Sequence, residues 1–147
     1  MKKEELIAYK EEIEEAFGEC DVLTSSFNQQ VKNAGNTGKR KAHNGHSWID
    51  YWRAMTDNHK HRLTCNSCGK SIFVGKPDLI DYVDFGDKLE EHKAHGGHLW
   101  INAPKGADYT GGRYITPLCP SCNGQHDKQI NINKGAVCCK ELGAEMK

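Results

Sequence analysis

The sequence has no excess of charge of either sign. Its 147 residues include 20 basic and 20 acidic side chains, so the formal net charge is zero. No global field therefore draws the chain to nucleic acid or to an anionic membrane, and any phosphate contact requires a local basic patch. The chain also lacks an apolar run of the about 20 residues that span a bilayer, and residues 1–5 lack the apolar stretch of a signal peptide. These absences predict a cytoplasmic chain of modest core, without a membrane partner.

Cysteine is the residue type that the sequence has in excess. The seven cysteines form an odd set, which does not suit a complete disulfide framework, and a reducing compartment favours metal over disulfide. Four of them form two pairs with two-residue spacers, Cys65-Asn-Ser-Cys68 and Cys119-Pro-Ser-Cys122. Such a spacer lets both sulfurs of one turn face the same point, and zinc takes four thiolates in a tetrahedron. The spacing predicts one structural Zn²⁺ on these four residues. A redox-active pair or four unrelated core cysteines are the alternatives.

The residues around each pair predict how it is presented. Gly69 suits a positive φ that closes a hairpin turn, and Pro120 suits the first position of a helix. One pair on a hairpin turn and one at a helix start form a treble-clef arrangement. Of the other cysteines, Cys20 is interpreted as a small buried hydrophobe. The neighbours Cys138 and Cys139 are interpreted as ordinary thiols, although either could be an extra metal ligand.

Residues 1–60 are predicted to form an N-terminal helical region. Apolar residues recur at helical spacing up to Gly18, and Ser47 can cap a second helix whose apolar face is Trp48, Tyr51, Trp52 and Met55. These aromatic residues could stack on bases, but their spacing favours a core. Between the helices, residues 32–47 are predicted to be an exposed, mobile basic loop. Its Lys39, Arg40 and Lys41 are candidate nucleic-acid contacts or simply solvated side chains.

Residues 61–147 are predicted to form a zinc-binding module of short strands and helices. Strands are expected at 61–64, 71–74, 98–102 and 113–118, and the last two can pair as a hairpin. One or two short helices are expected between 77 and 93, another beginning around 119–123, and a last helix over 136–146. The fold class is therefore α+β, a small zinc-stabilised module with the N-terminal helices packed on it.

This order of motifs resembles the HNH, or His-Me finger, nucleases, in particular their zinc-bearing, endonuclease VII-like type. The matching segments are the first cysteine pair, Gly97-His98-Leu-Trp, and Ile115-Thr-Pro-Leu-Cys119-Pro-Ser-Cys122-Asn123, which together cover about residues 61 to 130. The resemblance implies a ββα-metal unit that hydrolyses phosphodiesters of DNA or RNA with one catalytic divalent cation, Mg²⁺ or Mn²⁺.

The family's roles carry over position by position. The resemblance implies that His98 is the general base that activates water and that Asn123 is the metal ligand on the helix. His126 and Asp127 lie three and four residues beyond Asn123, so they could complete a metal site or contact phosphate. A strand histidine that hydrogen-bonds within the fold is the other interpretation of His98, and solvated helix residues that of His126 and Asp127.

The sequence departs from the family at Gly97, where the family carries Asp or His. A hard cation needs oxygen ligands, usually including a carboxylate, and glycine supplies no side chain. Three functions are therefore open. The chain is an HNH-type endonuclease with an altered metal site, a catalytically degenerate HNH-like module that binds a protein or nucleic acid as an accessory or inhibitor protein, or a zinc-stabilised domain whose activity lies in its N-terminal helices.

Overall fold

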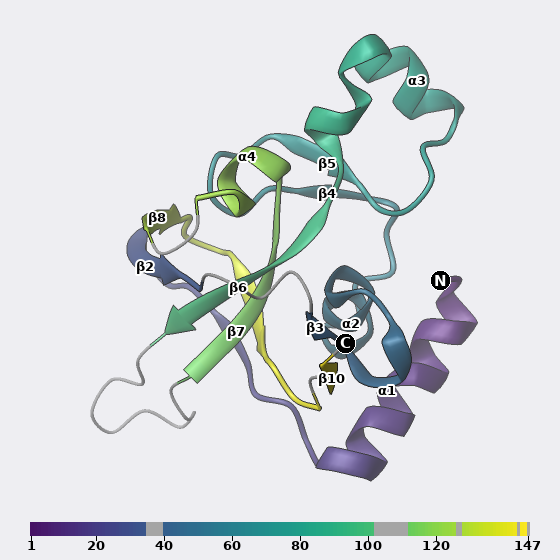
Figure 1. Cartoon of the computed structure of the whole chain (residues 1–147), viewed down its shortest axis with the longest axis vertical. Coiled ribbons are helices and arrows are strands. Elements are labelled where there is room, and N and C mark those ends of the chain that lie inside the picture. The colour runs from purple at the N-terminus through teal and green to yellow at the C-terminus, as the bar shows by residue number, and fades with distance from the viewer. Residues whose placement is uncertain (35–39, 102–111, 126–127, 144, 147) are drawn as a thin grey trace.

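The structure is a computed structural model that describes residues 1–34, 40–101, 112–125, 128–143 and 145–146. Its main feature is a six-stranded antiparallel sheet in the order β1-β9-β7-β6-β2-β8 (Figure 1). The strands of this sheet are β1 (Val22–Thr24), β2 (Gln29–Asn33), β6 (His95–Ile101), β7 (Gly112–Leu118), β8 (Gln129–Ile132) and β9 (Val137–Lys140). The chain is therefore of the mixed α+β class, as predicted, and the sheet takes strands from both predicted regions.

Smaller elements surround the sheet. Two further strand pairs are β4 (Arg62–Thr64) with β5 (Ser71–Phe73), and β3 (Arg40–Lys41) with β10 (Glu145–Met146). The helices are α1 (Lys3–Phe17), α2 (Trp48–Met55), α3 (Leu79–Phe85) and α4 (Pro120–Asn123), with short 3₁₀ turns η1 (His43–Gly45) and η2 (Gly86–His92). In the described part of the chain, no helix combines the length and the apolar character needed to cross a bilayer.

Helix α2 forms the centre of the core because it lies between the sheet and α1. Its four predicted face residues are all buried, and Ser47 caps it by accepting a hydrogen bond from the backbone N–H of Asp50. Helix α1 covers α2 with a buried stripe of Leu6, Tyr9 and Ile13. The aromatic residues of α2 are thus core residues and are not presented for stacking on bases.

The contact between α2 and the sheet is close at its first turn. A Cβ atom built on Gly96 of β6 would lie 2.6 Å from the backbone carbonyl carbon of Trp48. Only glycine at position 96 leaves room for this approach. The start of α2 therefore lies directly against the strand that carries His98.

Two sequence predictions about segments are wrong. The last helix expected over 136–146 is absent: residues 137–140 form β9, which pairs with β1 and β7, and residues 145–146 form β10. The predicted mobile loop over 32–47 is wrong at both ends. It begins inside β2, where Asn33 is buried, and Ala34 and Ala42 are buried as well. Residues 35–39 of that loop lie outside the described part of the chain.

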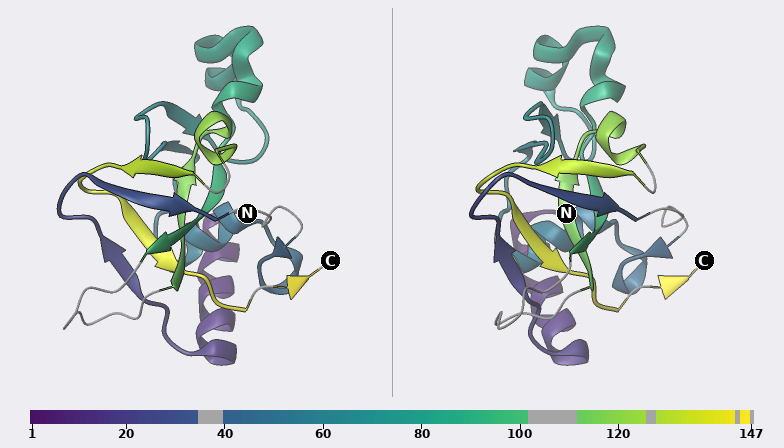
Figure 2. Two further views of the ribbon diagram at one scale, coloured as in Figure 1. Left: turned by 60° about the vertical axis from the view of Figure 1, so that its left-hand side comes forward. Right: turned by 90° about the vertical axis from the view of Figure 1, so that its left-hand side faces the viewer.

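Residues 1–60 are also not purely helical as predicted, because they contribute β1, β2 and β3. The other predicted helices and strands are confirmed. The strands expected at 61–64, 71–74, 98–102 and 113–118 correspond to β4, β5, β6 and β7, and β6 pairs with β7 in an antiparallel hairpin. The segment between 77 and 93 contains α3 and η2. Figure 2 shows that these two elements project beyond one end of the sheet, away from α1.

Candidate metal centre

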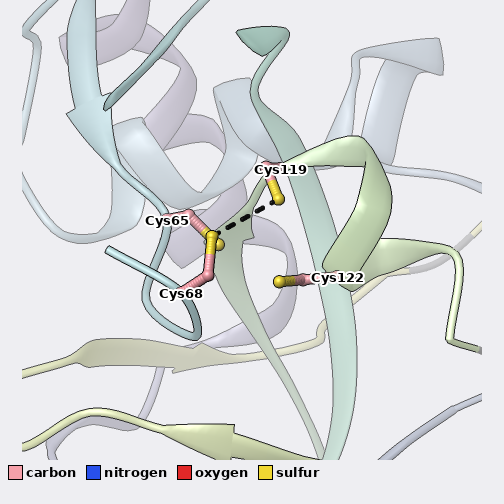
Figure 3. A group of neighbouring side chains, drawn as sticks. All are labelled: Cys65, Cys68, Cys119 and Cys122. Atoms are coloured by element: carbon pink, nitrogen blue, oxygen red, sulfur yellow. Dashed lines mark hydrogen bonds between the residues drawn. The ribbon is translucent and has the colours of Figure 1, made fainter. Parts of the chain in front are cut away.

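The first cysteine pair lies in the turn between β4 and β5. The backbone N–H of Cys65 donates to the carbonyl of Lys70 (2.8 Å), and that of Gly69 donates to the carbonyl of Cys65 (2.9 Å). Gly69 has φ +81°, the left-handed conformation expected from the sequence, so that the turn closes without strain. This turn brings Cys65 and Cys68 to one side of the hairpin (Figure 3).

The second pair lies where β7 passes into α4. Cys119 is the N-cap residue of α4, and Pro120 follows at the start of the helix, as predicted. The carbonyl of Cys119 accepts the N–H of Asn123 at 2.9 Å, which closes the first turn and holds Cys122 on it. Figure 3 shows the four side chains converging from the turn and from the helix start.

Asn66 locks the two halves of the centre together. Its backbone N–H donates to the carbonyl of Pro117 (3.0 Å), and its side-chain amide donates to the hydroxyl of Thr116 (2.8 Å). Its own carbonyl accepts the N–H of Asn133 at 2.9 Å. Sequence analysis did not find this role, because Asn66 stood out only by its position between two cysteines. Hydrogen bonds thus join the turn to β7 in addition to any bond through a metal.

The four sulfur atoms have the spacing of a metal site. They all lie within 4.8 Å of one another, and the Sγ atoms of Cys68 and Cys119 are 3.7 Å apart. A tetrahedron with Zn–S bonds of about 2.3 Å has edges of about 3.8 Å. Cys65, Cys119 and Cys122 are buried, whereas Cys68 is exposed. The four cysteines could therefore hold a metal ion such as zinc.

The thiols have unequal proton affinities in this cluster. Burial raises the pKa of Cys122 far above its ordinary value, and Cys65 and Cys119 beside it add to the rise. Burial also acts against the Cys65 thiolate, but backbone N–H groups, led by that of Cys68, outweigh it and lower the pKa of this thiol. A bound cation deprotonates coordinating thiols outright. The N–H groups around Cys65 are suited to stabilise such a thiolate.

The remaining cysteines lie apart from this cluster. Cys138 and Cys139 are fully buried in β9. The Cys20 thiol is half-buried and donates to the carbonyl of Lys140 at 3.2 Å. In the part of the chain that the structure describes, the cysteine metal cluster consists of the four predicted residues alone.

The two residues that the resemblance assigns to a catalytic site, His98 and Asn123, lie in different surroundings. His98 is only 5 % exposed, and its ring packs edge-on against Trp48 of α2, with ring centroids 5.0 Å apart. Successive residues of a strand point to opposite faces, and Gly97 accordingly faces the other way. A Cβ atom on Gly97 would lie 2.3 Å from Cδ1 of Leu118 and 3.3 Å from Oδ1 of Asn123. Asn123 thus lies beside Gly97, whereas His98 is covered by α2.

Of the other candidate residues, only Lys41 has a described side chain. His126 and Asp127 lie outside the described residues, as do Lys39 and the side chain of Arg40. Lys41 lies in β3, where it pairs with Glu145 of β10 and is partly buried. The described residues thus bring together the four cysteines, whereas the predicted basic contacts stay a prediction.

Sequence analysis did not find a second group of side chains of the kinds that bind metals, His61, Asp78 and Asp81. Asp81, fully buried at the start of α3, accepts hydrogen bonds from His61 (2.6 Å) and Arg62 of the neighbouring hairpin. Asp78 lies 3.5 Å from the same His61 nitrogen and forms a capping box with Asp81. Arg62 already neutralises Asp81, so this cluster fastens α3 to β4. No periodicity marks it, because its members meet only in the folded chain.

Burial of Asp81 acts against its charge, but the hydrogen bonds from His61, the backbone N–H of Asp78 and Arg62 outweigh it and lower its pKa to about 2. Asp81→Asn is therefore expected to lower the free energy of unfolding by about 2 kcal/mol at pH 7. The stabilisation is fully present above the unfolded pKa of about 3.9 and is lost as the pH falls through about 2.

Urea unfolding of both zinc-loaded proteins between pH 7 and pH 5 checks this expectation, because at lower pH the thiolates that would hold the metal are protonated. The difference should stay at about 2 kcal/mol over this range, since both limits lie above the unfolded pKa of Asp81. Asp87→Asn on the exposed side of the same segment is the matched control and should leave stability unchanged. Equal stability of Asp81→Asn and the unchanged protein at pH 7 would contradict an ionised Asp81 in this role.

Comparisons of the chain with protein-family models, with curated proteins and with solved structures found no match. The likeness to HNH nucleases therefore rests on the quoted motifs and on nothing else.

Proposed function

We propose that the chain is a zinc-stabilised, HNH-like module that binds a partner without cleaving phosphodiester bonds. In this proposal the four cysteines hold one structural Zn²⁺ in a treble-clef arrangement, and the β6–β7–α4 unit keeps the ββα form. The observation that carries the proposal is the position of His98. It is almost fully buried beneath Trp48.

A general base must come within hydrogen-bond reach of the water that it activates. His98 packs against the first residue of a helix that is itself buried between α1 and the sheet. Moving α2 away would expose its three buried aromatic residues, Trp48, Tyr51 and Trp52. The position of His98 thus supports a structural role for this histidine.

The site next to Asn123 also supports binding over catalysis. Position 97, where the resemblance places a metal ligand, has no side chain, and the space for one is filled by Leu118. A lone amide oxygen is a weak anchor for a hard cation, which prefers carboxylates. Both the base and the metal ligands of the nuclease are therefore compromised.

An endonuclease with an altered metal site is the second candidate. It is favoured by one observation: Oδ1 of Asn123 would lie 3.3 Å from a Cβ at position 97, the neighbourhood that the resemblance requires. In this candidate the metal would be Mg²⁺ or Mn²⁺ and the target DNA or RNA.

A cleavage assay separates the two functions. We expect no cleavage of supercoiled plasmid, single-stranded DNA or RNA by the zinc-loaded protein with Mg²⁺, Mn²⁺ or Ca²⁺. His98→Ala and Asn123→Ala should behave like the unchanged protein, because neither residue acts on a phosphate. Cleavage that is lost in both variants, while Asp87→Asn retains it, would overturn the proposed function in favour of the nuclease.

A further inference from the structure

The segment that projects from the sheet carries an unusual apolar surface. Four of the seven residues of α3 are large, apolar and exposed: Leu79 (78 %), Ile80 (64 %), Tyr82 (56 %) and Val83 (76 %). Isolated exposed apolar residues are ordinary, but a contiguous patch marks an interaction site. Figures 1 and 2 show α3 at the outer end of the molecule, and the exposed fractions of these side chains show that the described residues leave them largely uncovered.

These residues do not hold α3 to the body of the protein. The attachment is made by Asp81 with His61 and Arg62, and by Phe85, which lies under the Arg62 guanidinium (4.6 Å to the ring centroid) and stacks on His92 (centroids 3.9 Å apart). The inward side of α3 is thus polar and aromatic, and its apolar side faces outward. Such an orientation costs solubility and is unfavourable for an isolated chain.

The charge around the patch restricts what can cover it. Residues 78–91 contain six carboxylates and one lysine: Asp78, Asp81, Asp84, Asp87, Glu90 and Glu91 against Lys88. Arg62 pairs with Asp81 and Asp84, and Lys93 pairs with Glu90, so the excess of exposed negative charge is carried by Asp78, Asp87 and Glu91. This concentration of negative charge repels nucleic-acid phosphates and anionic lipids. It complements a surface that carries lysine or arginine.

A hollow beside the patch offers an anchoring point. It has a volume of about 520 Å³ and lies between β5, α3 and η2. Its lining combines the apolar Phe73, Pro77, Tyr82 and Leu89 with the charged Lys76, Glu90 and Lys93. Partner side chains that dominate binding usually fill a pocket of this kind, surrounded by contacts that exclude water. Tyr82 belongs both to the hollow and to the exposed apolar patch, so the two are continuous.

We propose that Leu79, Ile80, Tyr82 and Val83, together with this hollow, form the docking surface for a protein that presents an apolar patch flanked by lysine or arginine. The inference deepens the proposed function, on which it rests, by naming the class of partner. Here the acidic face of the α3–η2 segment (residues 79–92) steers the basic partner, and the apolar residues provide the contact that excludes water.

A designed peptide tests the surface with the full-length, zinc-loaded protein. The probe is a fluorescent amphipathic helix with leucine at i, i+3, i+4 and i+7 and lysine elsewhere. Its two controls replace every lysine by glutamate or every leucine by serine. Anisotropy at physiological salt should show binding of the Leu/Lys peptide only. Amide shifts in an NMR titration should concentrate in residues 73–93.

Substitutions in this surface then show which residues contribute to the affinity for the peptide. Leu79→Ser with Val83→Ser should weaken binding at least tenfold, and Asp87→Lys with Glu91→Lys at least threefold. All four side chains are exposed, so that folding is retained. The matched control is Val22→Ser with Phe27→Ser, two exposed apolar residues elsewhere in the chain, which should leave binding unchanged.

Four outcomes would overturn the inference: no binding of the Leu/Lys peptide, equal binding of the Leu/Glu peptide, equal losses in the two apolar double variants, or self-association that the α3 variant abolishes. In the last case a second copy of the chain covers the patch. The cleavage assay is independent of all four. Peptide binding by a protein that cuts DNA would overturn only the proposed function, and absence of both would overturn only the inference.

Discussion

Cys119→Ser is expected to abolish the cooperative unfolding transition of the protein and to reduce its zinc content from about one ion per chain to none. Structural zinc in small domains supplies on the order of 10 kcal/mol, which is comparable with the whole stability of a domain. The four sulfurs converge from the β4–β5 turn and from the start of α4, so their metal links two segments that are 50 residues apart in sequence. Elemental analysis, circular dichroism and urea unfolding measure the effect.

Cys138→Ala is the matched control, because Cys138 and Cys119 are equally buried but only Cys119 belongs to the cluster. The control should retain one zinc and lose only about 1 kcal/mol, the transfer free energy of a small apolar group. Cys119 caps α4 through its backbone alone, without a side-chain hydrogen bond, so serine leaves the helix start intact. A folded Cys119→Ser variant with one zinc, or an unchanged protein that binds none, would contradict the zinc centre.

The cluster of four cysteines could be predicted from the sequence because its signal is local. Each pair sets its own turn, through Gly69 in one case and Pro120 in the other, and both turns have the expected form. The same holds for α2, whose cap and apolar face lie within nine residues of one another. What could not be predicted was how Asn66 fixes the first turn to Thr116 and Pro117, since that contact spans 50 residues.

The C-terminal segment shows why the wrong helix was expected. Residues 136–146 contain alanine, glutamate, leucine, lysine and methionine, all good helix formers. The segment nonetheless forms a strand over Val137, Cys138 and Cys139. This strand, β9, lies between β1 and β7 and hydrogen-bonds to both. Pairing with two distant strands outweighs a local preference of a few tenths of a kcal/mol per residue.

The position of His98 likewise depends on tertiary structure. The sequence predicts that His98 lies on a strand next to Gly97, so positions 97 and 98 point to opposite faces of the sheet. Which face is covered, however, is decided by Trp48, which lies 50 positions earlier and reaches β6 only because Gly96 allows a close approach. The resemblance drew attention to the glycine at position 97, but the sequence could not show that Leu118 fills the space beside it.

Gly97→Asp is expected to lower the free energy of unfolding by about 3 kcal/mol or more. Its Cβ would lie within 2.8 Å of two Leu118 carbons, and overpacking of this kind costs about 1–3 kcal/mol. A carboxylate placed in this buried position adds an unpaired charge. Restoring the family's acidic residue therefore requires more than one substitution, and urea unfolding of the zinc-loaded variant measures the loss.

A double-mutant cycle with Leu118→Ala tests the cause. Leu118→Ala alone creates a cavity that costs about 2–5 kcal/mol, but in the double variant the new side chain occupies that space. The pair should therefore be less destabilised than the sum of the single changes, by about 2 kcal/mol. Gly97→Asp combined with Leu6→Ala on α1 is the control, and its effects should add. Additivity in the Leu118 pair would show that the space at position 97 is not closed by Leu118.

The same double variant tests whether an acidic residue at position 97 creates a metal site next to Asn123. It would place a carboxylate beside Oδ1 of Asn123, which gives a hard cation two oxygen ligands at one point. Manganese binding followed by electron paramagnetic resonance should therefore appear in the double variant and be absent from the unchanged protein. Plasmid cleavage should still be absent, because His98 remains beneath Trp48 and cannot reach a water on that cation. Cleavage by the double variant would show instead that position 97 alone separates this chain from an active nuclease.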